Sequence, residues 1–182
     1  MPLRDVTFIT GNPHKAEYLQ KLLGLEIKHQ KVELDEIQSL DLKEIVIHKV
    51  KQAYEILKRP VLVEDVSLEF EELGGLPGPF IKFFIEHTGD QKICEMVSEN
   101  RNATARCIFA YYDGEAVVLF EGALQGSIAH SPAGDKGYGF DKVFIPEGYT
   151  NTRAQLSQED DLKTYLICKP IEKVREFLLT LD

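Results

Sequence analysis

Val61-Leu62-Val63-Glu64-Asp65 is the stretch that decides the fold, together with the Gly/Pro-rich run from Leu73 to Lys82 that follows it. A β-branched apolar run ending in two carboxylates is typical of a buried strand that carries acidic groups to a sheet edge. The glycines and prolines behind it predict a shaped loop, because glycine permits close backbone approach and proline fixes the path. With Lys82, these features indicate a metal and phosphate site. A solvated strand end followed by an ordinary turn is the alternative.

The composition limits what this stretch can belong to. A chain of 182 residues, 43% of them hydrophobic, is long enough for one domain with a sizeable core. The formal net charge of -9 argues against a general nucleic-acid or membrane-surface binder, which needs clustered lysine and arginine. No apolar run approaches the ~20 residues that cross a bilayer, and the N-terminus does not start a signal peptide, so we expect a cytoplasmic protein. The three cysteines, Cys94, Cys107 and Cys168, lack CxxC spacing and are predicted to be small core residues.

The start of the chain offers a candidate anion site. A predicted strand over residues 6–10 runs into Gly11, and Asn12 is a good N-cap for a helix that opens with proline. A strand, a glycine turn and a helix N-terminus present free N–H groups and a positive dipole end to an anion, and Lys15 adds a full charge. A plain strand-to-helix connection is the alternative. The motif is too short for a P-loop.

Strands and helices alternate through the first third of the chain. A predicted strand over residues 27–34 is followed by an acidic pair that includes Glu36. A helix then begins at Asp41 with apolar positions at a 3.6-residue period, and it carries Lys49, which is ordinarily a surface residue at such a position. The Val61 strand comes next. This order favours an α/β sheet with a right-handed crossover.

The second half adds antiparallel pairing. Residues 102–112 and 115–123 are strand-like and meet at Asp113-Gly114, a two-residue hairpin signal, so the sheet is predicted to be mixed. A second glycine-rich loop over residues 131–141 contains aromatic side chains that would either stack on a nucleobase or pack internally. A terminal amphipathic helix is predicted over residues 171–181.

Four motifs stand in series along nearly the whole chain: Phe8-Ile9-Thr10-Gly11-Asn12 with Lys15, Val63-Glu64-Asp65 with Leu68, Leu76-Pro77-Gly78-Pro79-Phe80-Ile81-Lys82, and Gly139-Phe140-Asp141 with Phe144. Together they resemble the inosine triphosphate pyrophosphatase (Ham1) family. The resemblance implies an α/β fold with a mixed central sheet and flanking helices, a single domain over residues 1–182 with two lobes around a deep cleft, and a homodimer. It also implies Mg²⁺-dependent cleavage of deaminated purine nucleoside triphosphates to monophosphate and pyrophosphate, with Mn²⁺ as an alternative ion.

The resemblance assigns roles to individual residues. Glu36 and Asp65 stand at metal-carboxylate positions with Glu64 adjacent, and such oxygen ligands suit a hard cation that bridges phosphates. Asp65 would also position or deprotonate the attacking water, with Lys15 and Lys49 as further catalytic groups. The phosphate chain would be held by these lysines together with Thr10, Gly11, Asn12 and Lys82. The base would be flanked by Gly139, Phe140 and Asp141.

The C-terminal segment departs from the family pattern. The motif Thr-x-Ala-Glu is present as Thr152-Arg153-Ala154 with glutamine in place of the glutamate, and Asp161 stands where the family has a lysine. Tyr165-Leu166-Ile167 takes the place of a Ser-His-Arg triplet whose His and Arg read the purine 6-oxo group. Loss of these donors predicts altered base choice, and an acid near a polyphosphate predicts weaker binding. A further hypothesis is that Arg153 now reads the base.

Two main hypotheses follow for the function. The first is a metal-dependent pyrophosphatase with altered base specificity, because the phosphate and metal motifs are intact. The second is a catalytically weak or inactive relative that binds a nucleotide or acts as an interaction protein. A hydrolase of another phosphate substrate is a third option.

Overall fold

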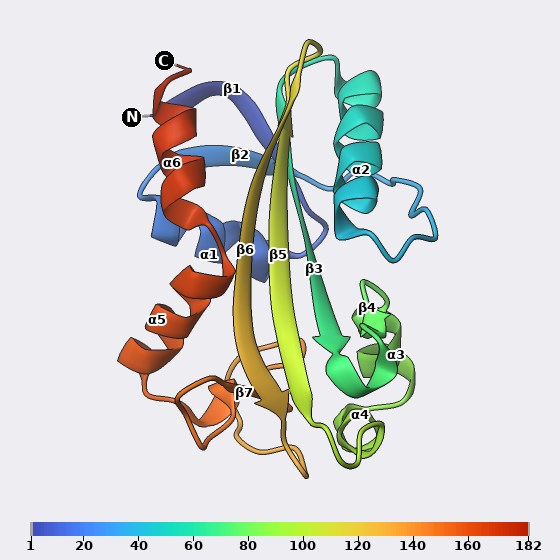
Figure 1. The fold of residues 1–182 in the computed structure, drawn as a ribbon. Helices are drawn as coiled ribbons and strands as arrows, with labels where there is room; N and C mark the ends of the chain where they lie inside the picture. The colour runs from blue at the N-terminus through green and yellow to red at the C-terminus, as the bar shows by residue number, and fades with distance from the viewer. Residues whose placement is uncertain (1, 182) are drawn as a thin grey trace. The chain divides into compact units, whose positions relative to one another are not determined.

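The structure is a computed structural model that describes residues 2–181 (Figure 1). Its strands are β1 (Pro2–Ile9), β2 (Glu26–Gln30), β3 (Val61–Phe70), β4 (Pro77–Gly78), β5 (Asn102–Tyr112), β6 (Val117–Ile128) and β7 (Phe144–Pro146). Its helices are α1 (Pro13–Leu23), α2 (Leu42–Leu57), α3 (Ile81–His87), α4 (Asp90–Glu95), α5 (Gln158–Cys168) and α6 (Ile171–Leu179), with short 3-10 turns at η1 (Glu71–Leu73) and η2 (Arg153–Gln155). Within residues 2–181, no helix is long and apolar enough to cross a membrane.

The sheet is mixed, and the predicted fold class is confirmed. The strand order is β2-β1-β3-β5-β6-β7, with β4 paired to β3. Strand β1 lies parallel to β2 and to β3, whereas β4 pairs with β3 and β7 with β6 in antiparallel fashion. Parallel neighbours need crossover connections, which α1 and α2 supply.

The chain divides into two compact units, and the divisions fall inside β3, β5 and β6 and between α5 and α6. Unit 1 comprises residues 1–65, 108–121 and 170–182, and unit 2 comprises residues 66–107 and 122–169. Each unit is described separately below. The single two-lobed domain and the deep cleft stay predictions.

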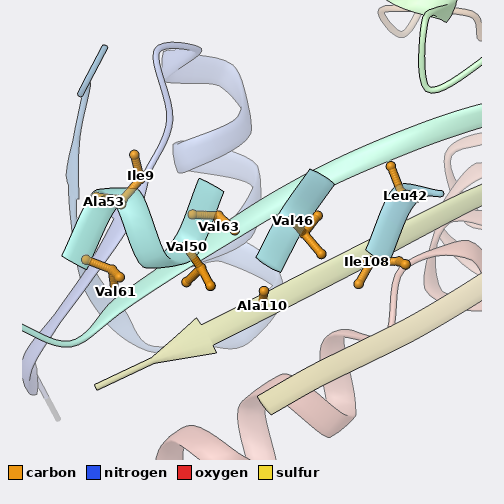
Figure 2. Packing of buried hydrophobic residues seen from close by; sticks show 9 residues of the cluster. All are labelled: Ile9, Leu42, Val46, Val50, Ala53, Val61, Val63, Ile108 and Ala110. Atoms are coloured by element: carbon orange, nitrogen blue, oxygen red, sulfur yellow. The ribbon is translucent and has the colours of Figure 1, made fainter. Parts of the chain in front are cut away.

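Helix α2 packs on one face of the sheet in unit 1 (Figure 2). Val46 and Val50 of α2 are fully buried, four residues apart on one side of the helix. They face alternate residues of the strands, because side chains two apart on a strand point to the same side. The cluster consists of Ile9, Leu42, Val46, Val50, Ala53, Val61, Val63, Ile108 and Ala110.

Helix α6 packs on the sheet through Phe177, which contacts one aromatic residue of β5 and one of β6. Its ring lies 4.9 Å from the Tyr111 ring and 5.3 Å from the Phe120 ring, centroid to centroid. Tyr111 neighbours Ala110 of the α2 cluster, and the pleat of a strand sends successive side chains to opposite faces. Helices α2 and α6 therefore cover opposite faces of the sheet in unit 1, which Figure 1 shows as well. Arg175 of α6 also donates from Nε to the Leu23 carbonyl at the end of α1, at 3.0 Å.

In unit 2, Arg101 joins the segment after α4 to the end of β6. Its guanidinium donates to the carbonyl oxygens of Cys94 (2.7 Å), Val97 (2.6 Å), Ile128 (2.7 Å) and Ala129 (2.5 Å). Backbone carbonyls at the end of a helix or strand need such partners when they are buried. Arg101 is therefore a structural residue of this unit.

Several element boundaries differ from the sequence prediction. Strand β2 ends at Gln30 rather than at residue 34, and β3 continues past Asp65 to Phe70 because Leu68 and Phe70 are fully buried. The expected two-residue hairpin is wrong. Asp113 Oδ1 instead accepts hydrogen bonds from the N–H groups of residues 115 and 116, so the connection spans residues 113–116.

The remaining predictions concern α5 and the cysteines. Helix α5 has no counterpart among the predicted elements. Its start did carry a signal, since Ser157 caps the helix by accepting from the Asp160 N–H at 3.1 Å, and acidic residues fill the first turn. The three cysteines are buried, as predicted, and none of them forms a disulfide.

Candidate functional site

The turn between β1 and α1 is held by its own side chains. The Asn12 side chain caps α1 by accepting from the N–H groups of His14 (3.0 Å) and Lys15 (3.4 Å), which confirms the predicted N-cap. The Asn12 N–H donates to Thr10 Oγ1 at 3.1 Å, and Pro13 has no N–H to offer. The N–H groups of residues 12, 14 and 15 are therefore already paired and are not the free donors expected at this helix N-terminus. What this turn offers an anion is the helix dipole and the Lys15 charge.

Glu64 and Asp65 lie in β3 just beyond the end of β1. Phe8 is level with Leu62, and β1 stops one residue later, so the two carboxylates follow the last residue that β1 pairs. Lys15 Nζ lies 3.5 Å from Glu64 Oε1, and the Glu64 side chain is only 3% exposed. The structure thus brings Lys15 of the first motif and Glu64 of the second into one ion pair.

Lys49 of α2 joins two carboxylates that are far apart in sequence. Its Nζ lies 2.8 Å from Asp65 Oδ2 and 3.3 Å from Glu36 Oε1. Burial opposes the charge on the ammonium, but the carboxylates of Asp65 and Glu36 outweigh it and hold the pKa of Lys49 above its ordinary value. Three of the predicted site residues therefore meet at one point in unit 1.

Glu36 lies in the connection between β2 and α2, which has no regular secondary structure. Its neighbour Asp35 is bound to Gln52 of α2 by two hydrogen bonds. The Asp35 N–H donates to Gln52 Oε1 at 2.8 Å, and Gln52 Nε2 donates to Asp35 Oδ2 at 2.9 Å. This reciprocal pair fixes the loop next to Glu36. Sequence reasoning missed Gln52, and only its spacing of three residues from Lys49 on the same helix hinted at it.

The donor set at Lys49 suits a divalent cation that arrives with a phosphate. Among residues 2–181, no group of three or more His, Cys, Asp or Glu side chains is gathered as a metal cage. Mg²⁺ rarely uses such cages and is usually held by one or two carboxylates plus the substrate's phosphates. Glu36 and Asp65 converge on a single cationic atom and provide that number of carboxylates. Glu64, the third predicted ligand, pairs with Lys15 instead.

In unit 2, the predicted base-flanking loop is held by Asp141. The Asp141 carboxylate accepts from the Tyr138 N–H at 3.0 Å, and its carbonyl accepts from the Ala154 N–H at 3.0 Å. Gly137 has φ +74°, and a Cβ there would lie 2.3 Å from Asp141 Oδ2, so this glycine is required. Gly139 also has a left-handed φ of +63°. The loop conformation therefore depends on glycines and on one buried carboxylate.

The other unit 2 residues of the predicted site are less enclosed. The half-buried Phe140 ring lies 6.2 Å from the Phe144 ring, centroid to centroid, in an edge-to-face arrangement. Part of its role is therefore internal packing. Lys82 is exposed in the first turn of α3, on a different element from this loop. The roles of both residues at the phosphates or base stay predictions.

Arg153 is the centre of a charged cluster behind this loop. Its Nη1 lies 3.3 Å from Asp141 Oδ1 and its Nη2 lies 2.7 Å from Asp161 Oδ1. The guanidinium carbon also lies 5.3 Å from the centroid of the Tyr165 ring, and the side chain is only 7% exposed. Burial raises the pKa of Asp141, and the Arg153 charge opposes that rise. The negative charge of Asp161, where the family has a lysine, is therefore partly compensated by Arg153.

The three residues at the place of the family's Ser-His-Arg triplet lie on α5. Tyr165 is buried, and its hydroxyl lies 3.2 Å from the Tyr138 hydroxyl. Leu166 and Ile167 are 42% and 59% exposed. Their side chains carry no hydrogen-bond donor. The structure thus shows no replacement donors at the second and third of these positions.

The match to known proteins extends over most of the chain. The model of the Ham1 family matches residues 6–175. The chain belongs to the Ham1 family. Two relatives, each named inosine triphosphate pyrophosphatase, are those of Yarrowia lipolytica, 40% identical over 96% of this chain and 95% of the relative, and of Schizosaccharomyces pombe, 38% identical over 97% and 96%. The solved structure of a HAM1 protein from Coxiella burnetii has a TM-score of 0.84 at 22% identity and covers 96% of this chain and 98% of its own. The resemblance to the Ham1 family is thus confirmed.

Proposed function

We propose that this Ham1-family chain is a metal-dependent nucleoside triphosphate pyrophosphatase with altered base specificity. The observation that carries the proposal is the meeting of Glu36, Lys49 and Asp65 at one point in unit 1. The Lys15–Glu64 pair lies next to it, because Glu64 precedes Asp65 in β3 and Lys15 lies in the first turn of α1. Inosine triphosphate pyrophosphatases, as the relatives are named, hydrolyse phosphoanhydride bonds. The predicted enzyme class, a hydrolase of acid anhydrides, is thus confirmed.

The proposed reaction is attack of water on the α-phosphorus of a nucleoside triphosphate. The water oxygen forms a bond to phosphorus, the bond to the bridging oxygen of the β-phosphate breaks, and pyrophosphate leaves with the electron pair. Asp65 orients the water and accepts its proton as the general base. Lys15, Lys49 and Lys82 offset the phosphate charge, together with the dipole of α1. Thr10, Gly11 and Asn12 line the turn that would receive the phosphate chain.

The metal proposed for this site is Mg²⁺, which Mn²⁺ would replace. Glu36 and Asp65 would hold it, and Glu64 would remain the partner of Lys15 unless that pair opens. The metal would withdraw charge from the phosphate oxygens and help to orient them. All other steps are assigned to side chains of this chain.

The proposed change in base choice rests on unit 2. A site that hydrogen-bonds a base discriminates mainly through those bonds, and Leu166 and Ile167 cannot make them. Arg153 is a weak candidate to replace them, because both of its terminal nitrogens bind carboxylates and its side chain is 7% exposed. We therefore expect Phe140 and Asp141 to contact the base with little discrimination between 6-oxo purines and other bases.

An Arg153→Lys variant tests whether Arg153 reads the base. We expect the ratio of its activities on ITP and ATP to equal that of the wild type.

The second candidate function is a nucleotide-binding relative with weak or no turnover. The lack of side-chain donors at Leu166 and Ile167 favours it, since weak base binding loses part of the energy that positions the α-phosphorus. We also propose, from the family resemblance, that the protein is a homodimer and cytoplasmic. Light scattering of the purified protein tests whether it is a homodimer.

A pyrophosphate-release screen distinguishes the two candidates. We expect turnover of several nucleoside triphosphates with Mg²⁺ or Mn²⁺, and complete loss on addition of EDTA with recovery on adding back metal. Phosphate should be detected only when inorganic pyrophosphatase is added, because the product is pyrophosphate. Thermal stabilisation by nucleotides without turnover of any of them would instead establish the binding protein.

Variants at Asn12 separate its capping role from phosphate binding. Asn12→Asp keeps an N-cap acceptor, so we expect no loss of thermal stability. The new negative charge beside Lys15 should raise KM for the triphosphate about tenfold, equivalent to about 1.4 kcal/mol. Asn12→Ala loses the cap and should lower the free energy of unfolding by about 1 kcal/mol. Equal KM values for wild type and Asn12→Asp would place the phosphates elsewhere.

A further inference from the structure

We propose that Lys49 is a built-in counter-cation that holds the Glu36 and Asp65 carboxylates together and must leave them before a divalent metal can bind. The proposal rests on the proposed function of these carboxylates as metal ligands. It makes Lys49 a positioning residue that competes with the metal, in addition to any contact with the substrate.

The first argument is the position of the ammonium. Lys49 Nζ lies between two carboxylates, at 2.8 Å from Asp65 Oδ2 and 3.3 Å from Glu36 Oε1. A Mg²⁺ ion held by the oxygens that Lys49 contacts would lie about 2.0–2.1 Å from them. An ammonium and a dication cannot share these oxygens at such distances, because their like charges repel strongly in a partly buried place. The two cations therefore exclude each other.

The second argument is the origin of the two carboxylates. Asp65 is fixed in β3, whereas Glu36 belongs to an irregular loop. Two like charges brought together from separate elements repel each other unless a cation lies between them. Lys49, only 16% exposed, supplies that cation from a regular helix. The two carboxylates are thus already held together before metal binds, with the Lys49 ammonium in the place of the divalent cation.

The third argument is what the lysine does after displacement. Its four-carbon stem is flexible and its ammonium offers three donors, so it can turn to a phosphate oxygen without any change in the helix. Metal binding then becomes favourable when a triphosphate is present to receive the lysine. The protein should hold free metal weakly and bind metal and triphosphate together.

Binding of Mn²⁺ to the nucleotide-free protein tests this directly. We expect Lys49→Met to bind Mn²⁺ about tenfold more tightly than wild type in a titration followed by electron paramagnetic resonance, a change equivalent to about 1.4 kcal/mol. The matched control is Lys43→Met. It removes the same charge from the same helix, but Lys43 pairs with Glu121 (2.9 Å) and should leave the affinity nearly unchanged. Affinity in Lys49→Met equal to or weaker than in wild type overturns the proposal.

Two further variants keep the test decisive. Lys49→Gln should tighten Mn²⁺ binding as Lys49→Met does, because both variants remove the ammonium. A folding defect in either variant would show in its melting curve. Adding Asp65→Asn to Lys49→Met should abolish the gain. If the double variant binds as tightly as Lys49→Met, the carboxylates are not metal ligands and the proposed metal site fails. If wild type already binds as tightly as Lys49→Met and Asp65→Asn abolishes binding, the metal site stands and the counter-cation proposal is overturned.

Chemical labelling of lysines gives an independent measurement on the wild-type protein. In the absence of metal, Lys49 should acetylate more slowly than Lys43, whose side chain is 50% exposed. Saturating Mn²⁺ should raise the labelling of Lys49 severalfold and leave that of Lys43 unchanged, as read by mass spectrometry. Unchanged labelling of Lys49 at saturating Mn²⁺ contradicts the displacement.

Discussion

Asp65→Asn should abolish nearly all hydrolysis, with kcat lower by about 10²–10⁴-fold, the range expected for loss of a general base. The variant keeps the shape of the side chain but removes the charge that pairs with Lys49 at 2.8 Å. An amide cannot accept the proton of the attacking water and binds a hard cation poorly. The rate of pyrophosphate release at saturating nucleotide and metal is the measurement.

The control for this variant is Glu121→Gln. It also removes a carboxylate paired with a lysine of α2, since Glu121 Oε1 lies 2.9 Å from Lys43 Nζ, but it lies outside the proposed site. We expect it to retain the wild-type rate. Both variants should melt cooperatively, because Lys49 keeps Glu36 as a partner in Asp65→Asn. A kcat for Asp65→Asn within tenfold of wild type would remove Asp65 from the proposed mechanism.

Arg153→Met should produce the largest loss of stability. The substitution leaves the Asp141 carboxylate, whose side chain is 11% exposed, without its closest cation. Breaking one side of a buried ion pair costs about 3–5 kcal/mol of the free energy of unfolding. Urea unfolding at pH 7, followed by circular dichroism, measures this cost. The control Arg106→Met breaks the more exposed pair with Glu69, at 3.0 Å, and should cost at most about 1 kcal/mol.

The same variant should show a characteristic pH dependence. Burial already raises the pKa of Asp141, and loss of Arg153 should raise it further. A raised carboxyl pKa means that the folded protein holds this proton more tightly than the unfolded chain does, so the group favours folding at low pH and loses that contribution as pH rises through the folded pKa. The deficit of Arg153→Met should therefore be smaller at pH 5 than at pH 7. A deficit that grows on acidification would show that Asp141 is not the group left unpaired.

Local chemistry predicted the parts of this chain whose structure is decided locally. Asn12 and Gly24 delimit α1 as expected, because capping depends on a few adjacent residues. Strand β5 begins and ends where the strand-like run of the sequence does. By contrast, α5 has little amphipathic pattern, since exposed Leu166 and Ile167 interrupt its polar face, and its helical character could not be inferred from periodicity.

The site was predictable as a set of residues but not as an arrangement. The motifs placed Lys15 near the first turn and Asp65 in a strand, and the parallel pairing of β1 with β3 explains why both come to the same sheet edge. Nothing in the sequence placed Lys49 between Asp65 and Glu36, because that contact joins a helix, a strand and a loop. The engagement of Arg153 by two carboxylates was equally hidden, since it depends on the path of the loop before β7.

The two hydrogen bonds between Asp35 and Gln52 have a consequence for how the affinity for metal is set. An irregular loop that must be ordered each time it supplies a ligand loses conformational entropy at every binding event. Gln52 orders the loop through its two hydrogen bonds to Asp35, of 2.8 Å and 2.9 Å. The conformational entropy of the loop is therefore lost during folding and not at each binding event. If Glu36 holds the metal as proposed, Gln52 would control the affinity of the site without touching metal or nucleotide, and changes at Gln52 would adjust that affinity gradually while the reacting groups stay the same.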